Sequence, residues 1–138
     1  MGVCARATEE ELADALASLA EVAPAQELRA PETGLVMVRG RIGGTGTPFN
    51  LGEVTVTRAV VQLANGCTGV AYLIGRSHRR ARLAAMVDAL AQDVANRARL
   101  EANLTRPVMA RFAAEDARVR ADGAATKVDF FTLVRGEG

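Results

Sequence analysis

The sequence predicts an α+β fold, in which an antiparallel sheet of three to four strands packs against helices. Apolar stretches at residues 34–42, 51–63 and 68–74 alternate with the period of β-strands and are separated by glycine-containing turns. Helical periodicity flanks these stretches on both sides. A chain of 138 residues has the length of one domain, and we expect residues 1–138 to form it.

The first helix is predicted over residues 9–22. Thr8 and Glu11 have the spacing of a capping box, in which each side chain bonds a backbone N–H of the first turn. Apolar residues at the spacing of one helical face support the helix: Leu12, Ala15, Leu16 and Leu19. Residues 24–30 are expected to connect this helix to the sheet, with room for a short extended piece at residues 27–29.

The first two strands are expected to form a hairpin whose polar faces coincide. Alternation places Arg39 and Arg41 on one face of strand 34–42, and Glu53 and Thr55 on one face of strand 51–63. The other face of the second strand carries valines. If the glycine-rich loop closes the hairpin symmetrically, the opposed pairs are Arg41 with Glu53, Arg39 with Thr55, and Val38 with Val56.

The dipeptide Asn65-Gly66 predicts a tight turn into the third strand, because both residues tolerate the positive φ that a type I′ turn needs. The result is a three-stranded antiparallel meander. Arg58 interrupts the valine face of the second strand. Either a bulge lies there or that part of the sheet faces a partner.

The C-terminal half is predicted to be mainly helical. Ser77 is expected to cap a long helix that reaches residue 99, and a second helix is expected over residues 105–123. Residues 127–134 are rich in β-branched and aromatic side chains, which predicts a final strand that joins the meander.

Two segments have the composition of anion-binding sites. The loop between the first two strands could cradle a phosphate with its backbone N–H groups, although it lacks the Lys-Ser/Thr ending of a P-loop. A flexible or interface-forming loop is the competing interpretation. Arg76, Arg79 and Arg80 lie at a helix start that could bind a polyphosphate or remain a solvated basic turn.

The sequence contains no complete catalytic signature. His78 is the single histidine, so zinc held by this chain alone is not expected. Glu53 is a candidate general base, but a cross-strand arginine would keep its carboxylate ionised and disfavour that role. Cys4 and Cys67 lack metal or redox spacing and are expected to be reduced thiols in the cytoplasm.

Overall charge also bounds the function. A formal net charge of +1 gives no field that favours nucleic acid or an anionic membrane as a partner. The N-terminal residues have no apolar run of signal-peptide or membrane-spanning length. We therefore expect neither nucleic acid nor membrane among the partners.

Four motifs in this order resemble the PhnG subunit of the bacterial carbon-phosphorus lyase system. They are ETGLVMVRGRIGGTG, LGEVTVTR, YLIGR and VDFFTLVRGE, and together with their spacing they cover most of the chain. The resemblance implies a small accessory subunit of a core complex with the PhnH, PhnI and PhnJ subunits, with two copies of each. It also implies a role in displacing adenine from MgATP by a phosphonate, which gives ribose 1-methylphosphonate 5-triphosphate.

In that setting MgATP is a substrate of the complex, and no cofactor is expected on this chain alone. A purely structural adaptor that touches no substrate is the main alternative, and a stand-alone anion-binding domain is a third. No residue is assigned a catalytic role. The candidate contacts to substrate or partner subunits are Arg39, Arg41, Gly43, Gly44, Thr45, Gly46, Phe49, Asn50, Glu53, Arg58, Arg76, Phe131 and Arg135.

Overall fold

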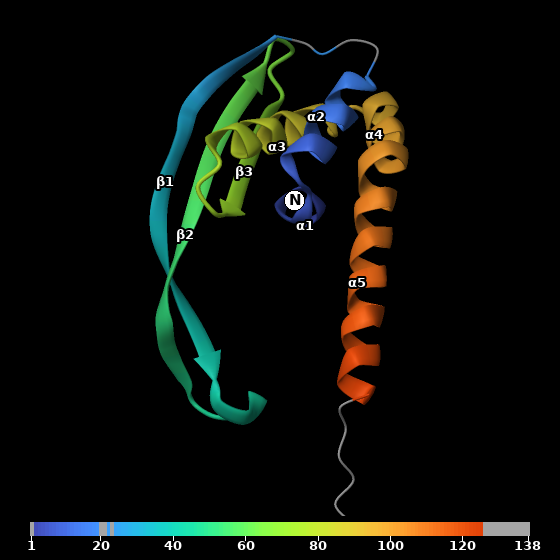
Figure 1. The fold of residues 1–138 in the computed structure, drawn as a ribbon. Coiled ribbons are helices and arrows are strands. Elements are labelled where there is room, and N and C mark those ends of the chain that lie inside the picture. Colours follow the sequence, from blue (N-terminus) through green and yellow to red (C-terminus); the bar gives the residue numbers. More distant parts are fainter. Residues whose placement is uncertain (1, 20–21, 23, 126–138) are drawn as a thin grey trace, which may run out of the picture.

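A computed structural model describes residues 2–19, 22 and 24–125 and has the predicted α+β fold (Figure 1). The described strands form one antiparallel sheet in the order β1-β2-β3. The strand predicted over residues 127–134 lies outside the described residues. The elements are α1 (Gly2–Arg6), α2 (Glu9–Ala17), β1 (Ala25–Arg41), η1 (Ile42–Gly44), β2 (Pro48–Leu63), β3 (Thr68–Ile74), α3 (His78–Leu90), α4 (Val94–Leu100), η2 (Glu101–Thr105) and α5 (Arg106–Ala125).

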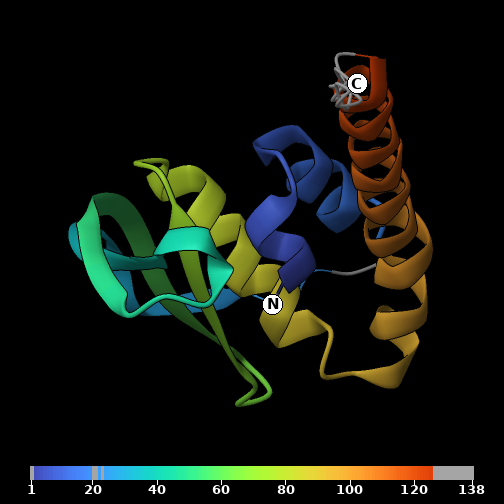
Figure 2. The same cartoon turned by 90° about the horizontal axis from the view of Figure 1, so that it is seen from below.

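Helix α3 covers one face of the sheet, α1 contacts both α3 and β3, and α2 and α5 lie beyond α3, as Figure 2 shows. The contact is close because small residues meet there. Ala85 and Ala89 of α3 lie against Gly69 of β3, where no room is left for a Cβ atom. Burial of an alanine side chain stabilises the fold less than burial of a leucine. Close van der Waals packing of α3 against the backbone of β3 therefore supplies a larger share of the stability of this contact.

The covered face of β2 is not its valine face. Thr57, Ala59, Val61 and Leu63 point toward α3 and are buried. The predicted valine face, interrupted by Arg58, is the face that α3 leaves uncovered. The alternation of side chains along the second strand was therefore predicted correctly, but the face that helices cover is set by the position of α3.

Residues 24–30 were expected to be a connector with a short extended piece at residues 27–29, but the extended segment is longer: β1 already begins at Ala25 and continues for 17 residues. This segment is a strand because the C-terminal half of β2 supplies its hydrogen-bond partners, and the local sequence does not indicate that pairing. The register shifts around Ala30 and Pro31, which together lie opposite Ala59. Proline fits this bulge in an edge strand because it has no N–H to donate.

The turn at Asn65-Gly66 joins β2 to β3 as predicted, but it is not of type I′. Only Gly66 has a positive φ, of 86°. Gly66 donates to the carbonyl of Leu63, and the Leu63 N–H donates to the carbonyl of Cys67. This is a three-residue loop of a type I turn followed by a left-handed glycine, which Asn65 reinforces by accepting the Cys67 N–H.

The predicted register of the first hairpin is wrong. Glu53 lies opposite Met37, not Arg41, and the partners of Arg39 and Arg41 are Asn50 and Pro48. The hairpin closes earlier than expected because η1 turns the chain at Ile42 and β2 begins at Pro48. The remaining expected pairs are displaced in the same way: Thr55 lies opposite Leu35 and Val56 opposite Gly34.

Helix boundaries also differ from those expected. The first long helix ends at Ala17, with Ser18 as its C-cap, and the expected helix to residue 99 is divided into α3 and α4. The division falls at Asp93, whose side chain accepts the Ala95 N–H and caps a new helix. α5 spans the second predicted C-terminal helix and follows α4 through the π-helical turn η2.

Candidate functional site

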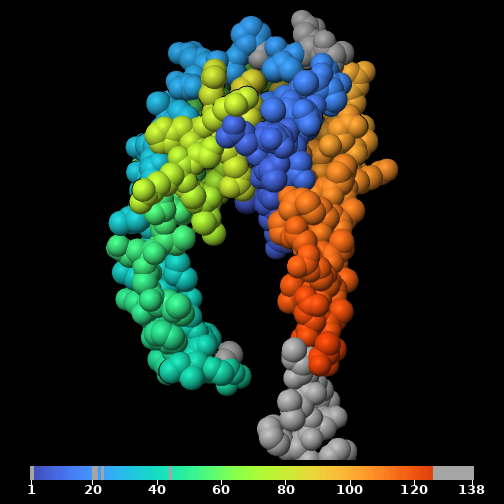
Figure 3. Space-filling view, in the orientation of Figure 1, coloured from blue at the N-terminus to red at the C-terminus, as the bar shows by residue number. Residues whose placement is uncertain are grey.

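The first candidate site is the part of the β1–β2 hairpin that extends beyond β3, which we call the distal arm (residues 35–55). Figure 1 shows that the distal arm and α5 project from the body in the same direction, and the space-filling view in Figure 3 shows an open gap between them. The arm consists of two strands and a short loop. Six of its large apolar side chains are exposed: Leu35, Met37, Val38, Ile42, Phe49 and Leu51.

The arginines of the distal arm lie on one face, as predicted. Met37, Arg39 and Arg41 are every second residue of β1, so their side chains project to the same side of the strand. Glu53 of β2 lies opposite Met37 and projects to that side as well. The described residues give Arg39 no ion-pair partner, and they contain no ion pair between Arg41 and Glu53. The arm therefore presents arginines that its own strands do not neutralise.

The glycine loop at the tip is closed by its own hydrogen bonds. The N–H groups of Thr45 and Gly46 both donate to the carbonyl of Ile42, and Arg41 Nη1 donates to the carbonyl of Gly46 at 3.0 Å. Gly43 has the positive φ, 61°, that this turn requires. Two of the amides that a phosphate cradle would use are thus already engaged, which favours the interface interpretation of the loop.

The second candidate site is a charged cluster on the uncovered face of the sheet. One oxygen of Glu32 accepts a hydrogen bond from Arg58 at 2.5 Å and another from Arg29 at 2.7 Å. These bonds, first that from Arg58 and then that from Arg29, hold the pKa of Glu32 below its ordinary value. An open pocket of about 200 Å³ adjoins the cluster and includes Val56 and Tyr72 in its lining.

Most of the polar side chains at the N-terminus of α3 form contacts with other residues of the same chain. Ser77 caps the helix by accepting the Arg80 N–H and donates its own hydroxyl to Glu9. Arg79 forms an ion pair with Glu9, and Arg80 donates to the carbonyls of Ala5 and Ala7. These contacts argue against the predicted polyphosphate site, because two of its three arginines already hold the N-terminal segment.

His78 takes part in a hydrogen-bond chain that the sequence did not indicate. Its Nε2 lies 2.9 Å from the hydroxyl of Thr33, which lies 3.2 Å from the hydroxyl of buried Thr57. Thr57 donates its proton to the carbonyl of Gly75, so Thr33 donates to Thr57 and accepts from Nε2–H of His78. The chain ties β1 and β2 to the start of α3.

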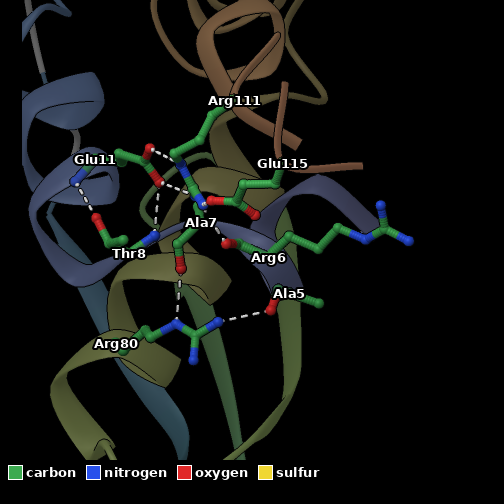
Figure 4. Close-up of polar contacts among 8 residues, drawn as sticks. All are labelled: Ala5, Arg6, Ala7, Thr8, Glu11, Arg80, Arg111 and Glu115. Carbon is green, nitrogen blue, oxygen red and sulfur yellow. Dashed lines mark hydrogen bonds and ion pairs between the residues drawn. The ribbon is translucent and has the colours of Figure 1, made fainter. Parts of the chain in front are cut away.

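A further ion pair fastens α5 to the N-terminal helices (Figure 4). Arg111 donates from Nε and Nη2 to the two oxygens of Glu11, each at 2.9 Å, and from Nη2 also to the carbonyl of Arg6. The hydrogen bonds from Arg111 lower the pKa of Glu11, and the same contact raises that of Arg111. The capping box identified Glu11 from the sequence, but nothing there singled out Arg111.

Both cysteines are free thiols, and burial raises the pKa of Cys4. Among residues 2–19, 22 and 24–125 there is no group of three metal-ligating side chains. None of the described helices is both long enough and apolar enough to cross a membrane. Two of the candidate residues, Phe131 and Arg135, lie outside the described part of the chain.

An exposed apolar arm whose arginines have no ion-pair partner among the described residues, together with a sheet face that carries an ionic cluster, is typical of proteins that dock onto other macromolecules. The chain belongs to the PhnG family: the family model described as phosphonate metabolism protein PhnG matches residues 1–136. A curated relative from Rhizobium meliloti (strain 1021), described as alpha-D-ribose 1-methylphosphonate 5-triphosphate synthase subunit PhnG, is 56% identical over 140 residues. That match covers 99% of this chain and 87% of the relative.

Proposed function

We propose that this chain is an accessory subunit of a synthase that converts MgATP and a phosphonate to ribose 1-methylphosphonate 5-triphosphate with release of adenine. The relative's name supplies the product, and its description as a subunit supports partner chains. In this reaction a phosphonate oxygen bonds to C1′ of the ribose as the bond from C1′ to adenine breaks. The proposed partners are the PhnI, PhnH and PhnJ subunits, with two copies of each in the assembly.

The distal arm is the observation that carries this proposal. The triphosphate and the phosphonate are both anions, and Arg39 and Arg41 project from one face of an arm that extends beyond the body of the molecule. The exposed apolar side chains of the arm supply a docking surface beside them. We propose that the arm binds PhnI and places the arginines near the anionic groups of the substrates.

The test is adenine release by the reconstituted assembly with Arg39→Ala or Arg41→Ala. Loss of one charged hydrogen bond corresponds to about a ten- to a hundredfold lower rate at unchanged assembly. Arg118→Ala is the matched control, since Arg118 is an exposed arginine of α5. Full adenine release by both arm variants would refute substrate contact through these residues.

A structural adaptor is the second candidate function, and the apolar arm favours it. Its signature differs from that of a substrate-binding arm. Leu51→Asp or Phe49→Asp in an adaptor should prevent co-purification with PhnI, whereas the arginine variants would leave both assembly and adenine release unchanged. If the arginine variants assemble normally and lose activity, the adaptor function is excluded as the whole explanation.

A further inference from the structure

The sheet has an apolar face that no described helix covers, which we call the open face. The register places seven apolar side chains on it, and they differ in exposure. Val70, Tyr72 and Ile74 of β3 are exposed, Val36 of β1 and Val54 and Val60 of β2 are half-buried, and Val56 of β2 is buried. The three side chains of β3 are at least 44% exposed, and Ile74 reaches 69%. The solvent-facing side of an antiparallel sheet is normally polar, so this composition indicates a surface that another macromolecule covers.

A β-bulge builds the charged cluster in the middle of the open face. Arg29 lies opposite Val60 and Glu32 opposite Arg58, with Ala30 and Pro31 together opposite a single residue. Arg29 and Glu32 are three positions apart and would point to opposite faces of a regular strand, but the extra residue of the bulge puts both on the open face. The bulge therefore brings Arg29 to the side of Arg58, where both bind one oxygen of Glu32.

The charge of this cluster discriminates between occupants. Two arginines and one glutamate leave one net positive charge within an apolar surface. A second copy of the chain, docked face to face, would bring two such clusters together and repel. A carboxylate on a partner instead balances the charge, and it can accept the N–H groups of Arg58 and Arg29 that Glu32 does not use.

The size of the adjoining pocket points to a side chain. Its volume of about 200 Å³ is below the roughly 300–1,000 Å³ of pockets that bind small molecules. We propose that the open face binds a partner subunit of the synthase through an apolar surface that carries an aspartate or glutamate, whose carboxylate pairs with Arg58 and Arg29. This inference rests on the proposed function only in requiring that the chain works within an assembly.

The test compares variants of the open face with exposed residues elsewhere. Ile74→Asp and Arg58→Glu are expected to weaken assembly with the partner subunits at least tenfold, measured by titration and native mass spectrometry. Val94→Asp on α4 is the control for Ile74→Asp, because Val94 is also exposed, at 77%. Arg82→Glu is the control for Arg58→Glu, because the side chains of Arg82 and Arg58 are exposed to 50% and 52%. Arg58→Gln tests the charge without placing a second carboxylate beside Glu32.

A photo-reactive phenylalanine analogue in place of Tyr72 identifies the occupant. The expected adduct is a partner-subunit peptide that contains an aspartate or glutamate. Replacement of that residue by asparagine or glutamine should weaken assembly as much as Arg58→Gln does. An adduct to a second copy or to residues 126–138 of the same chain would overturn the inference, as would normal assembly of both open-face variants. Because the proposed function is tested through Arg39 and Arg41 in assembled complexes, either proposal can fail while the other stands.

Discussion

Replacement of Gly69 by alanine is expected to destabilise the isolated chain through the contact between β3 and α3. A Cβ atom at this position would overlap the carbonyl oxygen of Ala85 and lie 2.8 Å from the Cβ of Ala89. Both neighbours belong to a helix held in the core, and the two nearest atoms, the Ala85 carbonyl oxygen and the Ala89 nitrogen, are backbone atoms. The helix must therefore move as a unit, since no flexible side-chain end can yield.

Overpacking of this kind costs about 1–3 kcal/mol. For a chain of 138 residues, an unfolding entropy of about 2.1 cal/mol/K per residue gives close to 0.3 kcal/mol/K at the midpoint. The expected decrease in Tm is therefore about 3–10 °C. Because α3 also covers Ala71 and Leu73, a displaced helix should expose apolar surface, and amides of β3 should exchange faster.

Thermal and urea unfolding of Gly69→Ala and Gly34→Ala measure the effect. Gly34 is the matched control because it is also a strand glycine without a positive φ, and its Cβ would meet nothing within 4 Å. The control should be unchanged or slightly stabilised, because alanine restricts the unfolded chain. Equal stability of the two variants would show that α3 does not lie directly on the backbone of β3.

Three further predictions follow from the described contacts. Arg111 lowers the pKa of Glu11, so this pair stabilises the fold fully above the ordinary carboxyl pKa of 4.5, and its contribution is lost as pH falls through the lower folded value. Arg111→Met should therefore flatten the acid limb of a stability–pH profile, and an unchanged slope would contradict the assignment. Thr57→Val should cost about 1–3 kcal/mol in urea unfolding, because it leaves the Gly75 carbonyl and the Thr33 hydroxyl without their partner, whereas Thr57→Ser should retain most of the stability. Thiol labelling of the folded chain should modify Cys67 quickly and Cys4 slowly, since Cys4 is buried and its pKa is raised; equal rates would contradict its burial.

Local signals in the sequence predicted those features that depend on neighbouring residues. The capping box at Thr8 and Glu11, the cap at Ser77 and strand 68–74 all have the predicted form. Each is set by side chains within a few residues of one another. Arg58 was also singled out correctly as a break in an apolar face, with both a bulge and a partner surface left open, and a bulge does lie on the neighbouring strand.

Features that depend on distant residues were decided by the tertiary structure. The register of the first hairpin was misjudged because loop closure at η1 is not visible in strand alternation. The segment 25–30 is a strand because β2 offers it hydrogen-bond partners, and the valine face is open because α3 packs on the other side. The pairing of Arg111 with Glu11 joins residues 100 positions apart.

The sequence by itself determined the fold class, the order of the strands and the motifs that mark the PhnG family, because periodicity, caps and motifs are local. Only the tertiary structure decided which arginines remain available for partners. It engages Arg79 and Arg80 with the N-terminal segment, leaves Arg39 on the distal arm, and brings Arg29 to Arg58 through a bulge. The physical reason is that a side chain's partners are set by pairing and packing between segments that the sequence places far apart.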